Sequence, residues 1–166
     1  MSSARADPAG TAASRGRLHT LHPGDVACAD RDDRLETLLG SCVAVVLTDP
    51  RRTVAAMCHI VYPGGATKGA PEDTAYAGAA LDAMFSMLRG RGIDPHQCDA
   101  YVYGGGNMFP DRFQASHVGQ RNVRRVLDEL ERMNVRIVGR DVGGNCYRRL
   151  AWTVGPAEPR VVAASA

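Results

Sequence analysis

Two segments with helical periodicity divide this chain, and they constrain its fold more than any other feature. In residues 73–88, apolar side chains recur at spacings of three, four and seven from Leu81 to Leu88, and glycines follow the end of the segment. In residues 119–133, a similar apolar face lies opposite a charged one. We therefore expect two helices, each of which buries one face.

Short apolar runs bounded by turn residues make up most of the remaining chain. We expect them to be strands at 25–29, 42–48, 53–62, 98–106, 136–142, 149–154 and 159–164. The turn-forming DPRR joins the second run to the third, which indicates a hairpin. Strands and helices do not alternate regularly, and no dinucleotide-binding glycine fingerprint is present. The sequence thus predicts a single-domain α+β fold, with mixed or antiparallel β-sheets packed with two main helices in an α/β/β-type sandwich.

Length and composition limit the domain organisation and the class of partner. The chain has 166 residues, of which 45% are hydrophobic and 23% charged, as in an ordinary globular domain. Residues 1–17 lack an apolar period, so we expect a disordered N-terminal tail followed by one domain over 18–163. The formal net charge is only +2, without a basic block, which argues against a nucleic-acid partner.

The cysteines and the hydropathy pattern indicate the compartment. The five cysteines are irregularly spaced and form no CxxC pair, so neither a disulfide framework nor a zinc ribbon is predicted. No stretch resembles a signal peptide or reaches the length of a membrane span. We expect a cytoplasmic protein without membrane insertion and, because the helices show no exposed apolar seam, a monomer.

One cysteine stands at a turn that leads into a strand. Cys42 follows Gly40, where a change of backbone direction would leave N–H groups free to bind a carbonyl oxygen. His59 lies in the strand that the hairpin pairs with the Cys42 strand, so it could accept the thiol proton. Cys58 should point to the opposite face, into the core. The alternative is that Cys42 is simply a small buried residue.

Five motifs occur in order along the chain. They are TLLGSCVAVVLTDP at 37–50, AAMCHIVYP at 55–63, YGGGNM at 103–108, VGQRN at 118–122 and DVGGN at 141–145. Together they resemble the CheD family of chemoreceptor glutamine deamidases. The resemblance implies an amide hydrolase, a protein-glutamine glutaminase of chemotaxis, that converts selected glutamines of methyl-accepting chemotaxis receptors to glutamate and releases ammonia.

The resemblance also implies catalytic roles. Cys42 would be the nucleophile that forms a thioester with the glutamine side chain, and His59 would be the base. Thr37 would be the third catalytic residue, which holds the imidazole of His59. Glu36 is the alternative to Thr37, because a shift of one residue in a strand reverses the face that a side chain occupies.

Binding residues and partners follow from the same resemblance. We expect Gly40, Ser41 and Asn107 to contact the substrate, and the reaction needs no metal or organic cofactor. The protein substrate would be the receptor, and a CheC-type phosphatase of the chemotaxis response regulator is a further candidate partner.

Other functions remain open at this point. A non-catalytic adaptor could bind and regulate the CheC-type phosphatase, although the presence of Cys42 and His59 favours an enzyme. A cysteine hydrolase or transamidase could act on small molecules instead of a protein. A redox or metal role for Cys58 and His59 is the least favoured, because one pair supplies too few ligands.

Overall fold

The computed structural model describes residues 16–65, 70–112 and 116–166. These residues form strands, two α-helices and one short 3-10 helix. In chain order the elements are β1 (Leu18–Leu21), β2 (Val26–Asp30), β3 (Arg34–Leu39), β4 (Val43–Thr48), β5 (Val54–Ile60), α1 (Ala77–Gly90), η1 (Pro95–Gln97), β6 (Asp99–Gly104), α2 (Val118–Arg132), β7 (Arg136–Val142), β8 (Cys146–Thr153) and β9 (Arg160–Ser165).

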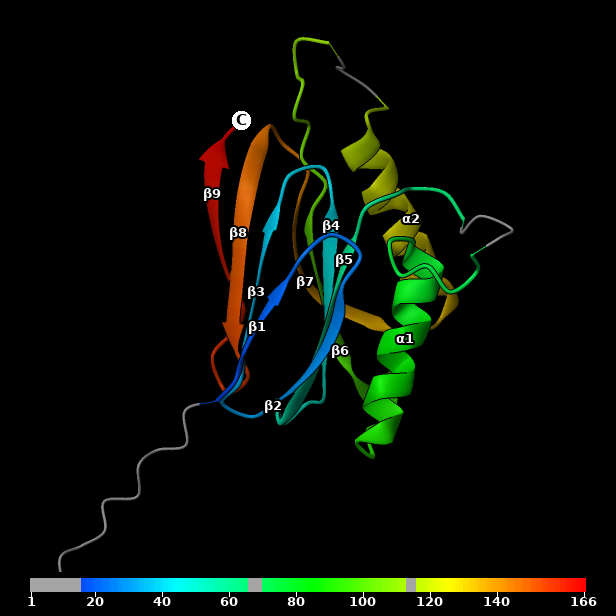
Figure 1. Ribbon diagram of the computed structural model, residues 1–166, viewed down its shortest axis with the longest axis vertical. Helices are drawn as coiled ribbons and strands as arrows, with labels where there is room; N and C mark the ends of the chain where they lie inside the picture. Colours follow the sequence, from blue (N-terminus) through cyan, green and yellow to red (C-terminus); the bar gives the residue numbers. More distant parts are fainter. Residues whose placement is uncertain (1–15, 66–69, 113–115) are drawn as a thin grey trace, which may run out of the picture.

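The strands form two mixed sheets that lie face to face (Figure 1). The four-stranded sheet has the order β1-β3-β8-β9, in which β1 and β3 are parallel and the other neighbours are antiparallel. The five-stranded sheet has the order β2-β5-β4-β6-β7, in which β6 and β7 are parallel and the other neighbours are antiparallel. Both helices cover the outer face of the five-stranded sheet (Figure 1). This confirms the predicted α+β class and its α/β/β layers.

Each face of the five-stranded sheet contributes to an apolar core. Along β4, Val43 and Val45 face the helices, whereas Ala44 and Val46 face the four-stranded sheet. Every residue of β4 and β5 is buried, as is typical of central strands covered on both sides. These two strands form the predicted hairpin and carry the region of Cys42 and His59.

The expected helices occur, with one shifted start. Helix α1 begins at Ala77 instead of residue 73, because the Asp73 carboxylate accepts the N–H of Ala75 at 3.0 Å and the Asp73 carbonyl accepts the N–H of Tyr76 at 3.2 Å. These local bonds stabilise a turn that competes with the helix. None of the described helices has the length and hydropathy of a membrane span.

Strands β1 and β3 were not predicted. In β3 the inward-facing residues are Leu35, Thr37 and Leu39, so a threonine interrupts the apolar alternation that identifies a strand. The four-residue β1 runs parallel to β3, and such a pairing leaves no hairpin signature in the sequence.

The N-terminal tail falls largely outside the described residues. Residues 1–15 of the expected disordered segment 1–17 are not described, whereas the N–H of Arg17 donates to the Asp33 carboxylate at 2.7 Å and its carbonyl accepts the N–H of Arg34 at 2.8 Å. The tail and the boundaries of the domain at 18–163 stay predictions.

Candidate active site

The turn between β3 and β4 carries Cys42 and is held by the glycine segment that follows β6. The N–H of Gly105 donates to the Cys42 carbonyl at 2.8 Å, and the N–H of Gly106 donates to the Gly40 carbonyl at 2.9 Å. Gly104 has a φ of 110°, and a Cβ at this position would lie 2.2 Å from the Cys42 carbonyl oxygen. Only glycine allows this approach. The YGGGN motif therefore fixes the backbone on both sides of Ser41.

The Cys42 side chain lies at the edge of the core between the two sheets. It is half-buried and packs against that core. Burial raises the pKa of the Cys42 thiol above its ordinary value. Within the described part of the chain the thiol forms no hydrogen bond. A thiol that is protonated at neutral pH needs a base to become a nucleophile.

His59 occupies the same face of the sheet on the neighbouring strand. It pairs with Ala44, two positions after Cys42, so Cys42 and His59 are diagonal neighbours at the end of the ladder. Diagonal neighbours in an antiparallel pair are about 7–8 Å apart, within reach of long side chains. His59 is only 2% exposed. Burial lowers the pKa of its imidazole, although the Asp25 carboxylate opposes the shift, so His59 is neutral near pH 7.

Thr37 reaches His59 from the opposite sheet. The Thr37 hydroxyl donates to the Leu21 carbonyl at 2.8 Å, and its oxygen lies 2.7 Å from Nδ1 of His59. Because the single hydroxyl hydrogen is directed to Leu21, the Thr37 oxygen is left as an acceptor and Nδ1 of His59 is the donor. In the neutral imidazole, Nε2 then carries the lone pair. The fold thus selects the tautomer of a buried histidine.

Glu36 and Cys58, next to these residues in sequence, face other surroundings. Glu36 is half-buried on the other face of β3, where its carboxylate lies 3.5 Å from the Thr20 hydroxyl and 3.3 Å from Nε of Arg34. Cys58 is fully buried in the helix-facing core, and burial raises the pKa of its thiol to about 12. The structure therefore brings Thr37, and not Glu36, to His59.

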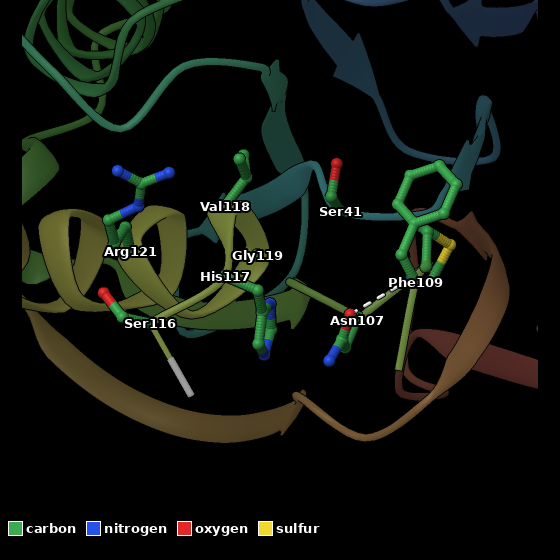
Figure 2. A pocket seen from close by; sticks show the side chains of 10 residues that line it. Ser41, Asn107, Phe109, Ser116, His117, Val118, Gly119 and Arg121 are labelled. Atoms are coloured by element: carbon green, nitrogen blue, oxygen red, sulfur yellow. Dashed lines mark hydrogen bonds between the residues drawn. The ribbon is translucent and has the colours of Figure 1, made fainter. Parts of the chain in front are cut away.

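A cavity of about 260 Å³ opens at Ser41, the residue before Cys42. Figure 2 shows Ser41 between the start of α2, at Val118, and the loop that carries Phe109. Phe109 is 61% exposed, although it is a large apolar side chain. An open, mostly apolar cavity with a few polar groups is a common form of ligand site, and this one begins at the residue before Cys42.

The three expected substrate-contact residues take different positions around this cavity. Ser41 and Asn107 both line it (Figure 2). The Asn107 side-chain oxygen accepts the N–H of Phe109 at 3.1 Å, so Asn107 shapes the loop as well as the cavity wall. Gly40 packs instead behind the turn, where a Cβ would lie 3.0 Å from the Met108 sulfur.

One residue of this region was not singled out from the sequence. Asn122 is fully buried on the face of α2 that packs on the sheet. Its side-chain Nδ2 donates to the Ser41 and Val61 carbonyls, each at 3.0 Å. A signal was present, because Asn122 precedes Val126 by one helical turn and so interrupts the apolar face with a polar side chain.

Comparison with protein families identifies the group to which this chain belongs. A family model described as CheD chemotactic sensory transduction matches residues 63–161. The chain belongs to the CheD family. The matched segment includes Asn107 and Asn122 and begins after Thr37, Cys42 and His59.

Individual relatives extend the similarity over most of the chain. A Pseudomonas fluorescens protein named probable chemoreceptor glutamine deamidase CheD is 37% identical over 133 residues, which is 78% of this chain and 75% of the relative. A protein of the same name, CheD 2, from Albidiferax ferrireducens is 34% identical over 81% of this chain and 80% of the relative. A Methanococcus maripaludis protein that is also named probable chemoreceptor glutamine deamidase CheD is 28% identical over 76% of this chain and 82% of the relative.

Two crystal structures have a partial similarity to this chain. A Neisseria meningitidis protein of the DUF152 type has a TM-score of 0.49 and 15% identity over 79% of this chain and 65% of its own. The hypothetical protein YfiH of Bacillus licheniformis has a TM-score of 0.47 and 15% identity over 76% and 60%, respectively. This chain spans less than two thirds of either structure.

Proposed function

We propose that this protein is a chemoreceptor glutamine deamidase, which hydrolyses the side-chain amide of selected receptor glutamines to glutamate and releases ammonia. The observation that carries the proposal is the buried Thr37–His59 pair beside the turn of Cys42. Membership of the CheD family and the names of the relatives support the substrate class.

In the first half of the reaction, Cys42 is the nucleophile and His59 is the general base. Nε2 of His59 takes the thiol proton as Sγ attacks the carboxamide carbon of the glutamine. The tetrahedral intermediate then collapses, the C–N bond breaks, and the proton on Nε2 passes to the departing ammonia. The product of this half is a thioester between Cys42 and the receptor side chain.

In the second half, water replaces ammonia. His59 accepts a proton from the water that attacks the thioester, and it returns this proton to the Cys42 sulfur when the C–S bond breaks. Glutamate and the free thiol result. During each proton transfer His59 becomes positively charged, and the Thr37 oxygen, which accepts the Nδ1 hydrogen, stabilises that charge and keeps the ring in position.

The protonation states of the free enzyme fit a base that acts only when substrate is present. Burial favours the neutral forms of both Cys42 and His59, so the resting site holds a thiol and an imidazole instead of an ion pair. A neutral imidazole with its lone pair on Nε2 is the form that a general base requires.

The cavity at Ser41 is the proposed entrance for the glutamine side chain. Phe109 and Val118 expose apolar surface at its rim, which suits contact with a protein segment better than a site for a small polar molecule. This favours a protein substrate over the small-molecule hydrolase alternative. The cytoplasm is the proposed compartment, because all five cysteines are free and Cys42 must stay reduced.

Mass spectrometry of a receptor cytoplasmic domain tests this function. The domain is incubated with the wild-type protein, with Cys42→Ala, or with Cys28→Ala, a matched control at a half-buried cysteine of β2. We expect conversion of glutamine to glutamate with the wild type and with Cys28→Ala, and none with folded Cys42→Ala. If the wild type converts no glutamine, the deamidase proposal is wrong, and a pull-down with a CheC-type phosphatase then tests the adaptor alternative.

A further inference from the structure

We infer that Asn122 is a positioning residue of this active site, which orients the peptide group between Ser41 and Cys42 so that the Cys42 N–H can bind the oxyanion. This inference rests on the proposed function, because it requires Cys42 to be the nucleophile. Asn122 itself does not touch the reacting atoms and acts through the backbone.

The contacts of Asn122 define the orientation of its amide. Both neighbours of Nδ2, the Ser41 and Val61 oxygens at 3.0 Å, are carbonyl groups that can only accept. The NH₂ group must therefore face them, and the side-chain oxygen must point elsewhere. Asn122 is 0% exposed, so water does not compete for these two bonds.

These two bonds close a gap in the sheet next to the nucleophile. The ladder between β4 and β5 ends with the pair Val43 and Ile60. After this last pair, the Val61 N–H donates to the Ala75 carbonyl at 2.8 Å and not to β4. The Ser41 and Val61 carbonyls lie beyond the ladder, and the Asn122 side chain from α2 donates a hydrogen bond to each of them. Asn122 thus links the turn of Cys42 to the end of the strand that carries His59.

The side-chain oxygen of Asn122 is a further feature of this position. Among the described residues, the Asn122 side-chain oxygen has no hydrogen-bond partner although it is buried. Buried acceptors without partners are costly and uncommon in folded proteins. A buried amide that bonds the Ser41 and Val61 carbonyls through its Nδ2, next to Cys42, fits a role in positioning the turn.

The geometry of the peptide group supplies the connection to catalysis. A trans peptide is planar, and its C=O and N–H point in opposite directions. Because the Ser41 carbonyl is bonded to Asn122, the Cys42 N–H of the same peptide group points in the opposite direction, away from Asn122. A donor fixed there can stabilise the negative oxygen of the tetrahedral intermediate.

Substitution of the amide tests this role. Asn122→Asp keeps the shape but places a carboxylate against two carbonyl oxygens, and Asn122→Leu removes the donor without adding charge. Gln120→Glu is the matched control, since it makes the same amide-to-acid change at an exposed position of α2. The readouts are kcat and KM for receptor deamidation, the folded fraction by circular dichroism, and the pH dependence of Cys42 alkylation by iodoacetamide.

We expect kcat of the folded Asn122 variants to fall by about 10- to 100-fold, as for a displaced catalytic group, with KM unchanged. In Asn122→Leu, which adds no charge near the thiol, the pH midpoint of Cys42 alkylation should stay at the wild-type value. Gln120→Glu should behave as the wild type.

Other results overturn the inference. A folded Asn122→Leu variant with wild-type kcat, a rise of KM alone, or a shift of the alkylation midpoint would each contradict positioning of the Cys42 N–H. Loss of the fold in both variants would assign Asn122 to stability instead. A wild-type protein that deamidates no receptor refutes the proposed function itself, whereas wild-type activity combined with an active Asn122→Leu refutes only this inference.

Discussion

The contact between Thr37 and His59 leads to a quantitative prediction for Thr37→Val. Valine has the shape of threonine but lacks the hydroxyl, so Nδ1 of His59 and the Leu21 carbonyl both lose their partner at a buried site. Hydrogen bonds to charged groups contribute about 1.5–3 kcal/mol. His59 is charged when it holds the thiol proton, so kcat should fall by about 10- to 150-fold.

Quantitative mass spectrometry of a receptor peptide at several concentrations measures this effect. Thr37→Val should lower kcat with little change in KM, and Thr37→Ser, which keeps the hydroxyl, should recover most of the loss. The buried groups left unpaired should also lower the free energy of unfolding by about 1–3 kcal/mol. The assay temperature must therefore lie well below the melting temperature of the variant.

Glu36→Gln is the control one position away in β3. Its side chain faces Thr20 and Arg34 on the other side of the strand, so activity should stay at the wild-type level. If a folded Thr37→Val variant keeps the wild-type kcat while Glu36→Gln loses activity, the assignment of the third catalytic residue to Thr37 is wrong.

Three further measurements test the site and its surroundings. Because His59 must be neutral to act as a base and burial lowers its pKa, kcat/KM should rise with pH through a midpoint below the ordinary value of about 6.5; a midpoint at or above that value contradicts a buried base. On acidification, His59 becomes protonated at a higher pH in the unfolded chain than in the folded protein. The free energy of unfolding should therefore reach its maximum contribution from His59 above about pH 6.5 and decrease as the pH falls toward the folded pKa. In His59→Gln this decrease should be absent when stability is measured against pH. Gly104→Ala should destabilise the fold by on the order of 1–3 kcal/mol from its positive φ alone, with further loss from contact with the Cys42 carbonyl, and a thermal melt equal to that of the wild type would refute the close approach.

Local patterns in the sequence were sufficient for several parts of the fold. The spacing of apolar residues identified both helices, because a helix face repeats within a few residues. The turn between β4 and β5 identified the hairpin, and the hairpin placed the strand of His59 beside that of Cys42. Alternation along β5 also separated Cys58 from His59, as the buried position of Cys58 in the helix-facing core confirms.

Other features depended on contacts between residues far apart in the chain. The sequence left Thr37 and Glu36 as alternatives, because a shift of one residue in a strand reverses the face that a side chain occupies. The choice depends on the parallel pairing of β3 with β1 and on the packing of that sheet against β5, which together place the Thr37 hydroxyl between the Leu21 carbonyl and His59. No local period encodes these distances.

Asn122 shows the same difference between what a local sequence pattern predicts and what tertiary contacts set, here on a helix. Its position on the apolar face of α2 can be read from the spacing to Val126, but its partners cannot. They are the carbonyls of Ser41 and Val61, which come together only when α2 packs across the end of the β4–β5 ladder. The sequence by itself determined which faces are buried, since this follows from residue type and short-range period, and its resemblance to the CheD family pointed to Cys42, His59 and Thr37 as candidate catalytic residues. Only the tertiary structure decided which polar groups meet, because a hydrogen bond needs two atoms within about 3 Å and the sheet register and helix packing set that distance.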